Sequence, residues 1–191
     1  MSKVFITSDH HFGHSNLLSF TDKDGDYFRG DKFTSVEEMD SEMIRIWNEE
    51  VSANDKVYHL GDFCMSSSSS HISRYAEALN GRKVFIRGNH DRGKLSYYAK
   101  HFKDVRSTHL LETGCSPVTH VVLSHVPIHP RSLRLGWVNV HGHTHEKPSP
   151  HGPYFSVCVE RHDYKPIEWN HLVSILNETL GPELEYLRGL Q

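Results

Sequence analysis

The sequence predicts one α/β domain spanning residues 1–191. The length of 191 residues fits a single domain, because domains usually hold about 100–200 residues. In the first half, short apolar segments alternate with segments of helical periodicity, which predicts parallel strands joined by helices. The second half holds further short apolar segments with little helix between them, which predicts additional strands.

The first half is expected to run strand, helix, strand, helix, strand. The strands are short, buried and rich in β-branched and aromatic side chains, at residues 4–8, 56–60 and 83–87. The first helix should begin after Ser35 and end near Val51, because Glu38 completes a capping box with Ser35. The second helix should span residues 71–80, and the polar, Gly- and Asp-rich residues 21–33 predict an irregular excursion.

The second half is predicted to be rich in strands. They are expected at residues 118–124, 137–140, 154–159 and 164–168. A final helix should run from Trp169 to about Leu180, where Gly181 and Pro182 are expected to stop it.

The composition argues against nucleic-acid binding, membrane association and sites built from cysteines. Lys and Arg number 21 against 24 Asp and Glu, so the net charge is −3 and gives no strong nucleic-acid footprint. No run approaches the roughly 18 apolar residues of a membrane span, so no membrane association is expected. The three cysteines form neither a disulfide framework nor a thiolate zinc site. The first residues lack the apolar core of a signal peptide, and we therefore expect a cytoplasmic protein.

Histidine is the unusual component, with 17 copies scattered along the chain. Several of them, together with Asp and Asn, fall where predicted strands end: Asp9, His11, Asp62, Asn89, His90, Asp91, His125, His143 and His145. Side chains at the carboxyl ends of neighbouring strands meet at one edge of an open α/β sheet. These residues are therefore expected to form one site.

The residue types in this set favour metal ions. Carboxylates and imidazoles without thiolates suit Mn²⁺, Fe or Zn²⁺. Two carboxylates, four imidazoles and an amide are too many ligands for one tetrahedral ion. The set therefore predicts two metals, which in phosphatases and nucleases lie about 3.5–4 Å apart.

The order of the motifs resembles the calcineurin-like metallophosphoesterase superfamily. Its pattern is D-x-H, G-D, G-N-H-[DE], a later H, and G-H-x-H, and this chain has every block in that order. The wider segments DHHFGHSN, LGDF and HGHTH are similar to those of small bacterial and phage members, at residues 9–16, 60–63 and 141–145.

The resemblance implies a four-layer αββα sandwich with two facing mixed sheets. It implies that Asp62 bridges two metal ions. The other ligands of the first ion would be Asp9, His11 and His145, and those of the second would be Asn89, His125 and His143. Mn²⁺ is the ion most expected, with Fe, Zn²⁺, Ni²⁺ or Co²⁺ as alternatives.

The resemblance also implies how the site would work. A hydroxide bridging the metals would attack the phosphorus of a phosphodiester in line. His90 would reach the phosphate and protonate the leaving oxygen, and Asp91 would orient His90. The expected substrate is a small-molecule or nucleotide phosphoester.

Residues outside the ligand set are candidates for contacts with substrate. His14 follows a glycine next to the first metal loop, and Asn89 and Arg131 are further candidates. Arg29 also lies in or beside a predicted rim loop, where it is a candidate phosphate clamp.

Two other functions stay open. One is a phosphomonoesterase or protein phosphatase. The large protein phosphatases carry a longer G-D-x-x-D-R-G segment and G-N-H-E, whereas this chain has GDFCM at residues 61–65 and Asp91, which favours a diesterase. The other is a non-catalytic scaffold such as the retromer subunit of this superfamily, which lacks the His that corresponds to His90.

Overall fold

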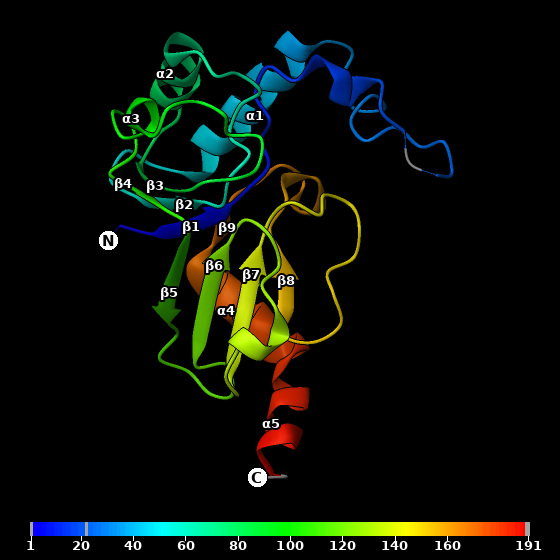
Figure 1. Ribbon diagram of the computed structural model, residues 1–191, viewed down its shortest axis with the longest axis vertical. Coiled ribbons are helices and arrows are strands. Elements are labelled where there is room, and N and C mark those ends of the chain that lie inside the picture. Colours follow the sequence, from blue (N-terminus) through cyan, green and yellow to red (C-terminus); the bar gives the residue numbers. More distant parts are fainter. Residues whose placement is uncertain (1, 22, 190–191) are drawn as a thin grey trace.

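The computed structural model describes residues 2–21 and 23–189, which form two β-sheets with helices (Figure 1). The first sheet has the order β4-β3-β2-β1-β9, with β1 (Val4–Thr7), β2 (Lys56–His59), β3 (Arg82–Ile86), β4 (Asp104–Arg106) and β9 (Ile167–Glu168). The second has the order β5-β6-β7-β8, with β5 (Thr108–Glu112), β6 (His120–Ser124), β7 (Trp137–His141) and β8 (Tyr154–Ser156). Both are mixed, since β9 is antiparallel to β1 and β5 is antiparallel to β6.

The helices are α1 (Val36–Glu50), α2 (Ser69–Ala78), α3 (Leu95–Tyr98), α4 (Trp169–Thr179) and α5 (Gly181–Gly189), with short 3₁₀ helices η1 (Ser15–Leu18), η2 (Pro130–Ser132) and η3 (Val159–His162). Helices α1 to α3 lie between strands in the chain, and α4 and α5 follow the last strand. The N-cap half of the predicted capping box is present, since Ser35 Oγ accepts from the Glu38 N–H at 3.1 Å, while Glu38 Oε2 accepts from the Thr34 N–H at 2.8 Å. The α/β class, the alternation of strand and helix in the first half and the two mixed sheets are confirmed.

The structure also departs from the predicted elements. The strands β4 and β5 and the helix α3 were not predicted, because β4 is only three residues long and β5 keeps most of its side chains at the surface. The predicted last helix ends where expected, because α4 stops at Thr179 with Leu180 as its C-cap, but Gly181 and Pro182 then begin a further helix, α5, that was not predicted. Proline is tolerated in the first turn of a helix, where its missing N–H has no partner to lose. No helix in the described ranges is long and apolar enough to span a membrane.

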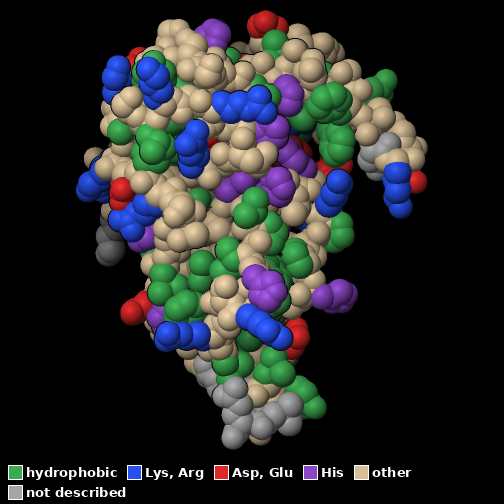
Figure 2. All heavy atoms as spheres, viewed as in Figure 1, with side chains coloured by type: hydrophobic (Ala, Val, Ile, Leu, Met, Phe, Trp, Pro, Cys, Tyr) green, Lys and Arg blue, Asp and Glu red, His purple; other side chains and the backbone are tan. Residues whose placement is uncertain are grey.

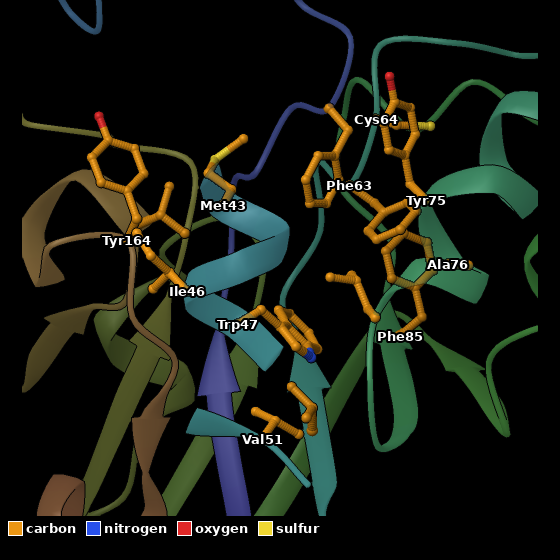
Figure 3. Close-up of a cluster of buried hydrophobic side chains, with 14 of the residues drawn as sticks. Met43, Ile46, Trp47, Val51, Phe63, Cys64, Tyr75, Ala76, Phe85 and Tyr164 are labelled. Atoms are coloured by element: carbon orange, nitrogen blue, oxygen red, sulfur yellow. The ribbon is translucent and has the colours of Figure 1, made fainter. Parts of the chain in front are cut away.

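Two apolar clusters, one on each face of the first sheet, hold these layers together. Successive strand side chains point to opposite faces, so Phe85 joins the cluster under α1 and α2 while Val84 and Ile86 join the other cluster. Figure 3 shows the first cluster, to which α1 contributes Met43, Ile46 and Trp47, and the residue after α1, Val51, also belongs. These contacts fix α1 and α2 on one side of the first sheet.

The second cluster lies between the two sheets. It joins Ile6, Leu60 and Ile86 of the first sheet region with inward side chains of β6 and β7, and α4 adds Leu172 and Leu176. Val121 and Leu123 of β6 face inward, while Asn139 of β7 faces the other way and accepts from the Ile128 N–H at 2.9 Å. The sheets therefore face each other, and the segment after β6 covers part of the outer face of the second sheet.

Candidate metal centre

The candidate ligands lie on loops that follow β1, β2, β3, β6 and β7. Backbone hydrogen bonds tie these loops together: Asp9 N–H donates to Gly61 O at 3.0 Å, and Gly142 N–H donates to His125 O at 2.9 Å. The His90 N–H donates to Asp62 Oδ1 at 2.8 Å, which links the loops after β2 and β3. Loops from both sheets are thus held at one edge, as predicted from the strand ends.

Left-handed backbone conformation is concentrated at the candidate ligands. Among the described non-glycine residues, seven have positive φ, and five of these are predicted ligands: Asp9, His11, Asp62, His143 and His145, with φ of 61°, 52°, 53°, 70° and 50°. Such φ values are uncommon outside glycine and cost roughly 1–3 kcal/mol each, and they cluster at functional sites. The surrounding structure therefore keeps the backbone at these five residues in an unfavourable conformation, as is common at functional sites.

Glycines allow the loops to approach closely. A Cβ added at Gly88 would lie 2.2 Å from Asp62 Oδ1 and 2.4 Å from Asp62 N. No side chain fits in that space, so this glycine permits the contact between the loops after β2 and β3.

Gly88→Ala is expected to displace the Asp62 carboxylate, because no real Cβ approaches an oxygen that closely. Metal bound per chain should fall, and hydrolysis of a phosphodiester should fall about 10²-fold, as expected for a catalytic group misplaced by about 1 Å. Gly189→Ala is the matched control, because nothing lies within 4 Å of a Cβ at that position. Unchanged metal content in Gly88→Ala would contradict the role of this contact.

The side chains form two adjacent groups that can each hold a metal ion. Asp9, His11 and His145 make the first subsite, and Asp62, His125 and His143 make the second, with the ligand atoms of each within 4.8 Å of one another. Figure 2 shows several histidine side chains gathered on the upper half of the viewed face.

Asp62 lies between the two subsites. Its Oδ2 is 3.5 Å from His11 Nε2 of the first subsite and 3.3 Å from His125 Nε2 of the second. Asn89 also joins the second subsite, with its Oδ1 2.7 Å from His125 Nε2. The structure therefore brings all seven predicted ligands together, with Asp62 Oδ2 close to one histidine of each subsite.

The donor atoms fit divalent cations. Asp9 Oδ1 and His11 Nε2 are buried and have no hydrogen-bond partner among the described residues, although buried polar atoms normally have one. Burial would raise the pKa of Asp9, but the nearby imidazoles of His11, His145 and His125 hold it well below its usual range. Burial would lower the pKa of His125, but Asp62 and Asp9 raise it to about 9. Metal binding there must displace protons, so we expect it to weaken as the pH falls.

Two histidines are oriented by hydrogen bonds at Nδ1. His125 Nδ1–H donates to Leu60 O at 2.8 Å, and His145 Nδ1–H donates to Glu160 Oε1 at 2.9 Å. In both rings the Nε2 lone pair is thereby left for the site. Metal-ligating histidines commonly have such a partner on the other nitrogen.

His90 lies beside the first subsite, but Asp91 does not orient it. The His90 and His11 ring centroids are 5.4 Å apart, and His90 Nδ1 is buried without a hydrogen-bond partner in the described part of the chain. The Asp91 carboxylate instead accepts from three backbone N–H groups, those of Asp62, Phe63 and Gly88, at 2.7, 2.9 and 2.8 Å. This corrects the predicted role of Asp91: it holds the loops after β2 and β3 together.

Of the other two residues predicted to contact substrate, one lies near the site and one does not. His14 lies near the site, with its ring centroid 5.5 Å from that of His11. Arg131 is exposed in η2, a turn that Figure 1 places near the start of β7 and therefore away from the ligands that follow its end. Residues 126–129 run back along the second sheet, so the structure does not bring Arg131 to the site.

Two residues near the first subsite were not predicted there. Glu160 contacts His145, and Cys158 Sγ lies 3.3 Å from Asp9 Oδ2. Both follow β8 and lie outside every motif, so no sequence signal pointed to them. Arg29, predicted as a phosphate clamp, is instead buried and paired with Glu160.

Comparison with known proteins gives relatives of similar length. No family model matches the chain. It is 30% identical over 187 residues to the uncharacterized protein MJ1445 of Methanocaldococcus jannaschii, covering 93% of each chain. It is 30% identical over 173 residues to the gene 66 protein of Mycobacterium phage D29, covering 77% of this chain and 80% of that one. The protein of unknown function AQ665 from Aquifex aeolicus shares the fold, with a TM-score of 0.66 at 21% identity over 92% of this chain and 100% of that chain.

Proposed function

The chain belongs to the family that includes MJ1445 and the phage D29 gene 66 protein, and we propose that it is a dinuclear-metal phosphoesterase of the calcineurin-like type. The observation that carries the proposal is the position of Asp62 Oδ2, between His11 Nε2 at 3.5 Å and His125 Nε2 at 3.3 Å. An aspartate placed between two adjacent His/Asp groups is suited to bridging a pair of metal ions. The substrate class is a phosphodiester of a small molecule or nucleotide.

The residues divide the work between binding and proton transfer. Asp9, His11 and His145 would hold one divalent ion, and Asn89, His125 and His143 the other, with Asp62 shared. When bound, such ions supply positive charge for the phosphate oxygens and lower the pKa of water enough to provide hydroxide near neutral pH. Mn²⁺ is the first ion to test.

His90 is the proposed general acid. It is near the first subsite, and the loop that carries it is fixed by the hydrogen bond from its own N–H to Asp62 Oδ1. Its imidazole can donate a proton to the leaving oxygen, which an alkoxide requires. Asp91 keeps this loop against the loop of Asp62, and His14 remains a candidate for a contact with the phosphate.

Removal of metal tests the proposal directly. Hydrolysis of bis-p-nitrophenyl phosphate is expected to disappear after exhaustive chelation and to return when Mn²⁺ is added, because the ligand set provides no other source of an activated nucleophile. Mg²⁺ and Ca²⁺ serve as the comparison, since imidazole-rich sites favour transition metals. Activity that survives chelation contradicts the two-metal proposal.

A further inference from the structure

Glu160 is a buried carboxylate directly behind a candidate ligand. It lies in η3, and its side chain is 2% exposed. Its Oε1 accepts from His145 Nδ1–H at 2.9 Å, and from Arg29 Nη2–H and Nε–H at 2.6 and 3.0 Å. The same oxygen therefore serves a candidate ligand and a buried cation.

Arg29 connects this carboxylate to the loop that follows β1. Its side chain is fully buried, and two further donors reach backbone carbonyls: Nη2–H donates to Asp9 O at 2.6 Å and Nη1–H to His10 O at 2.7 Å. One guanidinium thus joins Glu160 to the backbone of Asp9, another ligand of the first subsite.

One histidine of each subsite has a hydrogen-bond acceptor at Nδ1, and the two acceptors differ in charge. His125 of the second subsite donates to a neutral carbonyl, Leu60 O, whereas His145 of the first donates to the carboxylate of Glu160. A charged acceptor forms a stronger hydrogen bond and makes the imidazole a better metal ligand. With Nδ1–H committed to Glu160, His145 Nε2 faces Asp9 Oδ1 at 3.9 Å.

We propose that Glu160 is the positioning residue of the first subsite: it fixes the tautomer and direction of His145, and Arg29 holds it against the Asp9 loop. The inference rests on the proposed metal centre. It assigns a charged partner to His145 of the first subsite, whereas His125 of the second subsite has a backbone carbonyl in that position. Loss of the carboxylate should therefore weaken metal binding at one subsite only.

The test measures Mn²⁺ binding to each subsite by calorimetric titration of Glu160→Gln. Affinity at the first subsite should fall about 10–100-fold, the usual effect of losing such a partner, while the second subsite is unchanged. Asp40→Asn is the matched control. Asp40 is another buried carboxylate near the β1 loop, but it accepts from Gly13 N–H and Tyr75 OH and contacts no candidate ligand side chain. Unchanged affinity in Glu160→Gln, or equal weakening of both subsites, overturns the proposal.

Glu160→Gln leaves the buried Arg29 without its charge partner, which can unfold the protein. The double variant Arg29→Met/Glu160→Gln removes both charges, and Met39 and Met43 already contact this position. The double variant should fold and keep the selective loss, whereas Arg29→Met alone, which retains the carboxylate, should lose less affinity.

A second measurement does not depend on metal. Nitrogen-15 NMR of the metal-free protein at alkaline pH should show His145 protonated at Nδ1 in the natural protein and a mixture of tautomers in Arg29→Met/Glu160→Leu, because leucine, unlike glutamine, offers Nδ1–H no acceptor. An unchanged tautomer overturns the proposal for Glu160. Failure of the natural protein to bind Mn²⁺ instead overturns the proposed function, while the tautomer still decides the role of Glu160.

Discussion

Asp62→Asn is expected to give the largest loss of activity of any single substitution in the chain. Asp62 Oδ2 lies between the two subsites, so the change removes one negative charge from the surroundings of both ions. Each ion contributes several kcal/mol to stabilising charge in the transition state, so phosphodiester hydrolysis should fall at least about 10³-fold. Metal content per chain, measured by mass spectrometry of the purified protein, should fall for both ions.

Asp9→Asn provides the comparison. Asp9 Oδ1 lies 3.8 Å from His11 Nε2 and 3.9 Å from His145 Nε2 of the first subsite, and its Oδ2 accepts from His143 N–H and the Cys158 thiol. This variant should lose mainly one ion. Asp55→Asn is the control for a buried aspartate, because Asp55 accepts from backbone N–H groups of Lys3 and Ser52 before β2 begins. It should lower the melting temperature and keep both metals. Two metals retained in both Asp62→Asn and Asp9→Asn would mean that Asp62 does not bridge.

His90→Ala should separate proton transfer from metal binding. The N–H that donates to Asp62 Oδ1 belongs to the backbone, so the alanine variant keeps that bond and should keep both metals. Loss of a general acid costs about 10²–10⁴-fold, or roughly 3–5 kcal/mol of barrier. That loss should appear with alkyl esters, whose leaving oxygen needs a proton, and be smaller with p-nitrophenyl esters.

The pattern across substrates decides between the roles of His90. Equal losses on alkyl and p-nitrophenyl esters would assign the residue to stabilising the phosphate oxygens. Loss of metal from His90→Ala would make it a ligand. Asp91→Asn should behave differently from His90→Ala, because the Asp91 carboxylate accepts hydrogen bonds from three backbone N–H groups and so stabilises the loops. Its effect should therefore appear in the melting temperature as well as in activity.

The ligand set could be predicted because each member follows a strand that the sequence reveals. Asp9, Asp62 and His143 come within three residues of the ends of β1, β2 and β7, and parallel neighbours bring those ends to one edge. Predicting these strands was therefore enough to predict that the ligands lie close together. The short or exposed elements β4, β5 and α3 could be missed without disturbing the site.

Contacts between distant loops could not be predicted. Arg29 and Glu160 are 131 positions apart and meet only because the excursion after η1 folds back toward η3. Asp91 follows His90 directly, which suggested a pair, but the backbone turns the carboxylate toward the N–H groups of another loop. The position of Arg131 depends on the path of a long loop, and local sequence does not determine that path.

The left-handed backbone at five candidate ligands bears on how relatives of this chain should be compared. Asp, Asn and His tolerate that conformation better than other side chains, so a descendant that had lost its metals would still be selected to keep such residues at those five positions. Asn89 and His125 are the two candidate ligands outside the positive-φ set. Nothing in their local conformation demands an amide or an imidazole. Retention of these two residues in a relative is therefore the more informative sign that it still binds metal.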